Sequence, residues 1–130
     1  MATLPLRLSC ALVGALLAGI GAGTGAATGV ARDVTVILMT DAFRFEPDEV
    51  TIHAGDAVEW RNASPFDHVV TDDRKLGDAA IPAGAQVFSS DAIAPGRSYR
   101  RVFTTPGEYR YFCVPHEGIG MVGRITVLPR

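Results

Sequence analysis

The hydrophobic positions of this chain fall into two different patterns. Near the N-terminus they form one almost continuous stretch from Leu8 to Ile20, in which Ser9 is the only polar residue. From about residue 32 onwards they come in short runs of β-branched and aromatic residues, separated by Gly, Pro, Asn and Asp. Short runs that alternate between apolar and polar residues are typical of β-strands, and no convincing helical period interrupts them.

Seven segments are predicted to be strands and an eighth is compatible with one: residues 34–39, 49–53, 57–62, 68–71, 97–104, 109–113 and 121–128, and 85–89. Because the strands are short and are spaced by Gly- and Pro-containing turns, they indicate an all-β fold, an antiparallel β-sandwich. Residues 72–83 are polar and rich in turn formers, so we expect a surface loop there, with space for a helical turn. By alternation Tyr109, Tyr111 and Cys113 share one face, which we expect to be the core side.

Residues 1–31 are predicted to be a secretory signal peptide. Arg7 precedes the apolar stretch and a run of small residues follows it, which is the order that such signals have. Cleavage fits after Ala27 and after Ala31, and the sequence does not choose between them. An uncleaved membrane anchor is the alternative, because the stretch from Leu4 to Ile20 approaches spanning length. The glycine-rich exit favours cleavage.

Residues 32–130 then form a single exported domain, which suits their length. We expect this domain in the periplasm without stable membrane association, or at the extracellular face of the membrane if the N-terminal segment is retained. It carries 11 Lys and Arg against 14 Asp and Glu, and this balance gives no sign of the clustered basic surface that binds nucleic acid. Its only cysteine is Cys113, which excludes a disulfide within the domain. A lone cysteine in an exported protein is either a hazard or a ligand.

The run from Cys113 to Met121 concentrates the candidate chemistry. It places a thiol, the imidazole of His116 and a thioether within nine residues, in a loop made tight by Pro115 and two glycines. Soft sulfur ligands with imidazole suit copper, and one Cys, two His and a weak axial Met make a blue-copper site for electron transfer. The run supplies three of these four ligands. For Met121 the alternative is an ordinary packed strand residue, which its sulfur and imidazole neighbours argue against.

The remaining imidazole has to come from elsewhere in the chain, where His53 and His68 are the two choices. His68 begins a predicted strand after a turn-rich segment and can clamp the loop to the core, whereas His53 ends a strand just before Ala54-Gly55 and suits an exposed position. We therefore predict His68 as the ligand, with a surface histidine as the alternative. Zinc competes with copper for such a donor set, but it needs a general base, for which Glu117 is the only acid in the loop, and has no use for a thioether.

These residues resemble the cupredoxin family, nearest to its plastocyanin and pseudoazurin members, over essentially all of residues 33–128. Residues 106–116 and 120–123 match the family's ligand loop closely. The segments 45–62 and 67–70 are similar to its opening strands and to the segment that carries its first ligand. The resemblance implies a Greek-key β-sandwich with one type 1 copper per chain, and one-electron transfer between Cu(I) and Cu(II).

The copper ligands implied by the resemblance are His68, Cys113, His116 and Met121. Two positions depart from the family. Val69 stands where the family often has an Asn that ties the two ligand segments together. Phe112 stands where photosynthetic plastocyanins have a Tyr that provides a second electron route, so a photosynthetic partner is not implied.

We expect an exported electron carrier rather than an enzyme, docking transiently on redox proteins such as cytochromes or copper oxidoreductases. His116 is the predicted exit for the electron, and Phe66, Ile119 and Gly120 belong to a small apolar docking patch around it. Scattered apolar surface residues are the alternative for this patch.

Two other functions stay open at this point. A periplasmic copper-binding or delivery protein could use the same four residues, and a metal-free sandwich would leave Cys113 and Met121 as core residues. One further feature concerns the redox potential: Pro115 has no N–H to donate to the Cys113 sulfur, which favours Cu(II) and a lower potential.

Overall fold

A computed structural model describes residues 31–130 of the chain. The predicted signal peptide lies outside the described residues, except for Ala31, and stays a prediction. Among the residues that the structure describes, no helix has the length and apolar character needed to cross a membrane.

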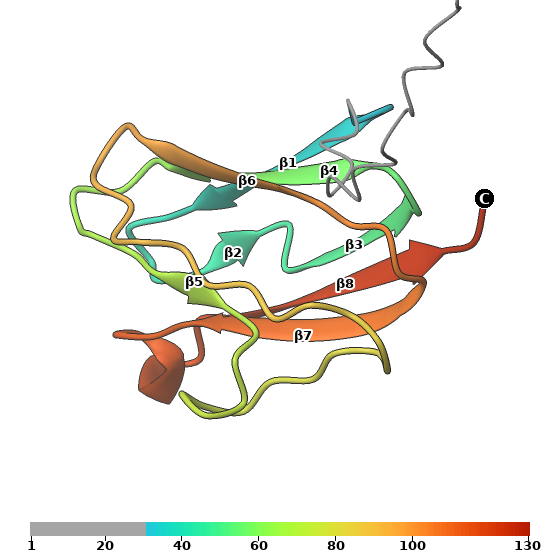
Figure 1. The fold of residues 1–130 in the computed structure, drawn as a ribbon. Coiled ribbons are helices and arrows are strands. Elements are labelled where there is room, and N and C mark those ends of the chain that lie inside the picture. The colour runs from blue at the N-terminus through green and yellow to red at the C-terminus, as the bar shows by residue number, and fades with distance from the viewer. Residues whose placement is uncertain (1–30) are drawn as a thin grey trace, which may run out of the picture.

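Two four-stranded sheets pack face to face (Figure 1). In the first sheet the strand order is β2 (Phe45–Glu46), β1 (Val34–Met39), β4 (Ala57–Asn62), β6 (Ser98–Val102). In the second sheet it is β3 (Glu49–His53), β8 (Val122–Leu128), β7 (Gly107–Cys113), β5 (Val70–Thr71). One short 3-10 helix, η1 (Glu117–Ile119), lies between β7 and β8.

The predicted all-β sandwich is present, but its sheets are mixed rather than antiparallel throughout. β1 pairs parallel with β4, and β3 pairs parallel with β8. The cause lies in the turn at Gly55, which has a φ of 97° and leads the chain from β3 in one sheet to β4 in the other. Consecutive strands therefore do not form a hairpin here, and each finds its neighbour elsewhere in the chain.

Some predicted elements differ in extent. The strand expected at 68–71 is shortened to Val70–Thr71, although His68 still bridges Ile93. Residues 85–89 form no strand, and only Ser89 makes an isolated bridge, to Thr71. The two-residue strand β2 and the helix η1 were not expected.

The core fills the space between the sheets. Trp60 lies at its centre, with ring centroids 5.3 Å from Tyr111 and 5.4 Å from Phe88. Tyr109, Tyr111 and Cys113 face this core and are buried, as the alternation predicted. Met39 is fully buried in the same cluster, which agrees with its interpretation as a packing residue.

The outer face of β7 is covered as well. Phe112 points away from the sandwich core along the alternation of β7, yet it is fully buried. The loop of residues 72–83 passes over Phe112 at Gly77, and farther along it pairs with the edge of β7, where Ala80 bridges Arg110 (Figure 1). The predicted loop is present at the surface, and it packs against β7.

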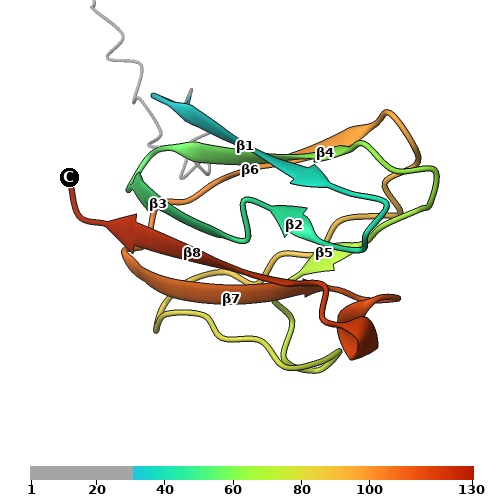
Figure 2. The same cartoon turned by 180° about the vertical axis from the view of Figure 1, so that it is seen from behind.

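The two ends of the sandwich differ in character. One end carries η1 and the turn after β7, and the other carries the C-terminus (Figures 1 and 2). The predicted ligands all lie in segments at the η1 end.

Candidate metal centre

His68, Cys113 and His116 come together at the η1 end of the sandwich. One candidate ligand atom of each lies within 4.8 Å of the others. The Cys113 Sγ atom is 3.6 Å from His68 Nδ1 and 3.3 Å from His116 Nδ1. The two imidazole rings are 5.0 Å apart between centroids and meet edge to face. The predicted grouping of one thiol and two imidazoles is thus present, with each histidine presenting Nδ1.

The loop after β7 is shaped by its own backbone hydrogen bonds. His116 N donates to Cys113 O at 3.1 Å, closing a turn, and Met121 N donates to His116 O at 3.2 Å. Cys113 N in turn donates to Met121 O at 3.0 Å. Gly120, with a φ of 89°, lets the chain leave η1 and start β8. These contacts bring three residues that are close in sequence to one point in space.

His68 reaches the same point from the segment between β4 and β5. Its backbone exchanges two hydrogen bonds with Ile93, at 3.2 and 2.7 Å, and its side chain is fully buried. The neighbouring Val69 accepts a hydrogen bond from Val114 N at 3.0 Å through its carbonyl. The two ligand segments are therefore tied by the main chain, although the Asn side chain that often does this in the family is replaced by Val69.

The electrostatics favour neutral imidazole and penalise an unbound thiolate. Burial raises the pKa of the Cys113 thiol, while the backbone N–H groups of Val69 and His116 act in the opposite direction. Burial, and then the nearby His116, lower the pKa of His68. Neutral histidine has the lone pair that a metal requires. A buried sulfur that is costly to ionise alone is the kind of group that a bound cation stabilises.

Met121 is fully buried and packs in the same core cluster as Cys113. Its backbone takes part in the hydrogen bonds that shape the ligand loop. Its role as the axial ligand stays a prediction that rests on the spacing of the loop.

Glu117 does not serve the site. Its carboxylate oxygen Oε1 accepts a hydrogen bond from Asp78 N at 2.7 Å, on the loop that covers β7. The only acid of the ligand loop is thus engaged elsewhere, and it is absent from the group of converging ligand atoms.

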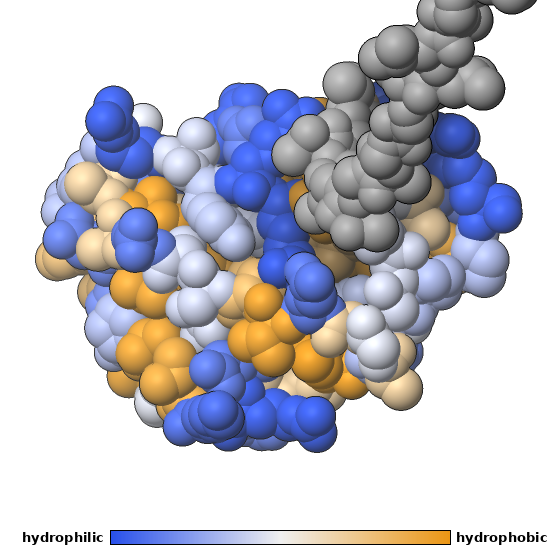
Figure 3. Space-filling model, viewed as in Figure 1, coloured by the Kyte–Doolittle hydropathy of each residue, from blue (hydrophilic) through white to orange (hydrophobic). Residues whose placement is uncertain are grey.

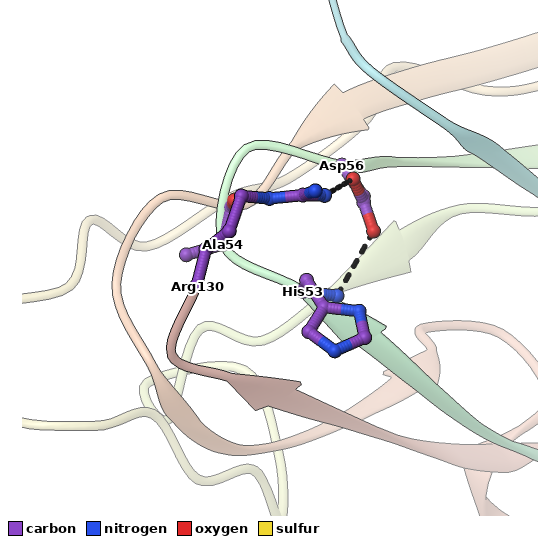
Figure 4. A network of polar contacts seen from close by, with 4 residues as sticks. All are labelled: His53, Ala54, Asp56 and Arg130. Carbon is purple, nitrogen blue, oxygen red and sulfur yellow. Dashed lines mark hydrogen bonds and ion pairs between the residues drawn. The ribbon is translucent and has the colours of Figure 1, made fainter.

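His53 lies at the other end of the molecule. It ends β3, and its backbone N–H donates to Asp56 at 2.9 Å in a network that includes Arg130 and Ala54 (Figure 4). The side chain is exposed. The prediction that His53 is not a ligand agrees with this position.

Of the four predicted ligands only His116 reaches the surface, and exposed apolar residues lie at the same end of the molecule. His116 is partly exposed, whereas His68 and Cys113 are fully buried. The exposed fractions of Ile119 and Phe66 are 57% and 46%. Val114 and Gly120 are exposed beside them, and apolar surface is visible among the polar side chains at this end (Figure 3).

Phe43 is a residue of this end that the sequence analysis missed. Its ring centroid lies 4.5 Å from that of His116 and 5.1 Å from that of Phe66. It adopts a φ of 55°, which is uncommon for a bulky residue and is frequent at functional sites. Arg44 holds this segment against the ligand loop by donating to Ile119 O at 3.0 Å. A Phe followed by Arg in a turn carries no sequence signal for such a role.

Comparison with known proteins places these features in a family. A sequence model described as copper-binding proteins of the plastocyanin/azurin family matches residues 32–128. The plastocyanin of Scenedesmus fuscus is 45% identical over 97 residues, which cover 73% of this chain and 99% of that protein. The chloroplastic plastocyanin of Tetradesmus obliquus is 46% identical over 86 residues, covering 66% of this chain and 59% of that protein's length.

Solved structures resemble the fold over a similar range. The Cu(I) form of an amicyanin variant gives a TM-score of 0.60 at 26% identity, over 76% of this chain and 86% of that one. The oxidised plastocyanin of Dryopteris crassirhizoma gives a TM-score of 0.58 at 27% identity, over 72% and 100% respectively. The β-sandwich predicted from the short strands and the resemblance to the cupredoxin family are both confirmed by these similarities.

Proposed function

Because the chain belongs to the copper-binding plastocyanin/azurin family, we propose that it is an exported carrier of single electrons between redox proteins. Members of this family bind copper and carry electrons rather than catalyse reactions. In this proposal the copper is held by His68, Cys113, His116 and Met121. The observation that carries it is the convergence of one ligand atom each from His68, Cys113 and His116 within 4.8 Å, with the Nδ1 atoms of the two histidines 3.6 and 3.3 Å from the sulfur.

The donor set fits copper. A thiolate with two imidazoles and a thioether is the combination that blue-copper sites use, whereas hard cations prefer carboxylate and carbonyl oxygens. No carboxylate is part of the group of converging atoms. Copper bound there supplies a one-electron couple between Cu(I) and Cu(II).

The chain's own residues then keep the site constant between the two oxidation states. The side chains of His68, Cys113 and Met121 are fully buried. Because protein interiors are closely packed, these side chains have little freedom to rearrange. A site that moves little on oxidation and reduction suits fast electron transfer. His116, the partly exposed ligand, offers the shortest path to a partner.

The apolar surface around His116 suits brief docking. Redox partners typically bury a small area and separate quickly. Phe66, Ile119, Val114 and Gly120 supply such a surface. Phe112, by contrast, is buried beneath the loop of residues 72–83. A second route for the electron through this position would therefore not reach the surface.

The partners and the compartment follow from the same proposal. We place the protein in the periplasm, exported by the N-terminal segment 1–31, with cytochromes or copper oxidoreductases as transient partners. The net negative charge of residues 32–130 argues against a nucleic-acid partner.

Addition of Cu(II) to the purified domain tests the proposal. We expect an intense visible band from charge transfer between the Cys113 thiolate and copper, and its loss in Cys113→Ser. Absence of the band, or its survival in the variant, contradicts the copper site. A reversible one-electron couple with fast self-exchange supports a carrier, whereas ready loss of Cu(I) to a chelator indicates a delivery protein instead.

A further inference from the structure

A buried chain of polar side chains stands behind His68. Its Nε2 atom, on the side of the ring away from Cys113, lies 2.7 Å from Ser64 Oγ. Ser64 Oγ in turn lies 2.8 Å from Asn62 Oδ1. All three side chains are buried. This chain starts at Asn62, the last residue of β4, and continues into the segment that follows it.

The orientation of the Asn62 amide is decided by its partners. One side of the amide faces two carbonyl oxygens, Phe66 O at 2.6 Å and Ile93 O at 2.8 Å, and has to be the NH2 group. The other side faces the backbone N–H of Ser64 at 2.9 Å and has to be the oxygen. Asn62 Oδ1 is therefore an acceptor, with no hydrogen to offer to the Ser64 hydroxyl.

The hydroxyl of Ser64 has one hydrogen and two lone pairs to distribute. Its hydrogen goes to an acceptor, Asn62 Oδ1 at 2.8 Å or Phe66 O at 3.2 Å. Its lone pairs then accept from Phe66 N at 3.2 Å and from His68 Nε2. The reverse arrangement, with the hydrogen on the His68 side, would leave two oxygens facing each other at 2.8 Å without a hydrogen between them. The proton of His68 is thus placed on Nε2.

We propose that Ser64 is a positioning residue for the copper site, whose hydroxyl, oriented by Asn62, holds His68 in the tautomer that leaves Nδ1 free for the metal. The free Nδ1 is the atom that lies 3.6 Å from the Cys113 sulfur. The same hydrogen bond fixes the plane of the ring before any metal binds. Partners of this kind, on the far nitrogen of a ligand histidine, typically change metal affinity 10- to 100-fold when removed. The inference rests on the proposed role of His68 as a copper ligand.

The tautomer is measured first in the metal-free wild-type protein, by long-range ¹H–¹⁵N NMR of the histidine rings. We expect His68 with its proton on Nε2. A proton on Nδ1 overturns the proposal, and this result needs no variant to fold. If the wild-type protein gives the blue band but His68 has the other tautomer, the role of Ser64 fails while the proposed function stands. If the band itself is missing, the proposed function fails.

Three variants then test the affinity for Cu(I), by competition with a chelator. Ser64→Ala removes the hydroxyl and is expected to weaken binding 10- to 100-fold and to let both His68 tautomers appear. Ser64→Thr keeps a hydroxyl and is expected to restore most of the affinity. Ser90→Ala is the matched control, because Ser90 is also buried and accepts a hydrogen bond from Val70 N at 2.9 Å without touching a ligand. Equal affinities of Ser64→Ala and Ser90→Ala overturn the proposal.

Discussion

At the scale of single residues, the hydrogen bonds to the Cys113 sulfur set how much charge it carries. The N–H groups of Val69 and His116 favour its negative form, and Pro115 between Cys113 and His116 contributes no N–H. Each added donor withdraws charge from the sulfur and makes Cu(II) less favourable. The potential of the site should therefore respond to a substitution that adds one donor without changing a ligand.

We predict that Pro115→Ala raises the midpoint potential. One net hydrogen bond of about 1 to 1.5 kcal/mol corresponds to a rise of roughly 43 to 65 mV in a one-electron couple. Voltammetry of the copper-loaded protein measures it. Pro129→Ala, an exposed proline next to the C-terminus, is the control and should leave the potential unchanged. An unchanged or lower potential in Pro115→Ala counts against the argument.

The candidate ligands could be predicted from the sequence because their residue types and spacing are constrained by the chemistry of the metal and depend little on conformation. Cys113, His116 and Met121 lie in one short run, and only two histidines were left for the remaining position. The contributions of Ser64 and Phe43 depend on conformation instead. Ser64 acts through a turn that places it beside His68, and Phe43 through a backbone with φ of 55° that its residue type does not predict.

At the scale of elements, the loop of residues 72–83 is fastened to the ligand loop through Glu117. The Glu117 carboxylate accepts from Asp78 N at 2.7 Å, and Asp78 forms an ion pair with Arg110 of β7 at 2.9 Å. Gly77 lies against the Phe112 ring of β7 and the Glu117 carboxylate. A Cβ atom there would overlap the Glu117 carboxylate and come within 2.6 Å of the Phe112 ring. The close packing of this loop on β7 thus requires a glycine.

We predict that Gly77→Ala destabilises the protein by about 1 to 3 kcal/mol, as overpacking of a filled site typically does. Urea unfolding of the metal-free protein measures the free energy. Gly118→Ala is the matched control, because no atom lies within 4 Å of a Cβ at that exposed position, and it should change the stability by less than about 0.5 kcal/mol. Equal stabilities of the two variants would show that the loop does not pack closely against β7 at Gly77.

The elements also mark the limit of what the alternation of apolar residues can predict. It predicted the bounds of β1, β3 and β4, because the residues of each strand that face the core are apolar and alternate with more exposed ones. It did not give the parallel pairing of β1 with β4, since the pairing depends on which sheet each strand joins after its turn. Residues 85–89 have a suitable pattern, yet their backbone is used in isolated contacts to the segment around Thr71.

At the scale of the whole molecule, the end opposite the site is closed by a charged network (Figure 4). Asp56 accepts a hydrogen bond from His53 N and pairs with Arg130, at the C-terminus of the chain. The His53 hydrogen bond, and then Arg130, lower the pKa of Asp56 below its ordinary value of 3.8, against the opposing effect of burial. A carboxyl with a lowered pKa in the folded state stabilises that state above pH 3.8 and loses this contribution as the pH falls through the folded pKa.

We predict that Asp56→Asn lowers the stability at pH 7 and that the difference from wild type shrinks steadily below pH 3.8. Asn keeps the shape of the side chain but presents no charge to Arg130. Urea unfolding at a series of pH values measures the difference. Asp91→Asn, at an exposed position, controls for the general loss of one negative charge. A deficit of the same size at pH 7 and at pH 2 would mean that packing, and not the charge of Asp56, is responsible.

The two ends also give a test of where electrons leave. Ile119, beside His116, and Leu128, at the end of β8, have exposed fractions of 57% and 40% and lie at opposite ends of the sandwich. We predict that Ile119→Glu slows electron self-exchange by about tenfold or more, because an unpaired carboxylate enclosed in an apolar contact costs more than ~1.4 kcal/mol, while the visible spectrum stays unchanged. NMR line broadening in mixtures of the oxidised and reduced protein gives the rate. Leu128→Glu makes the same change of side chain and of net charge at the far end and should exchange like the wild type. Equal slowing by both variants would mean that overall charge repulsion, and not contact at His116, controls the reaction.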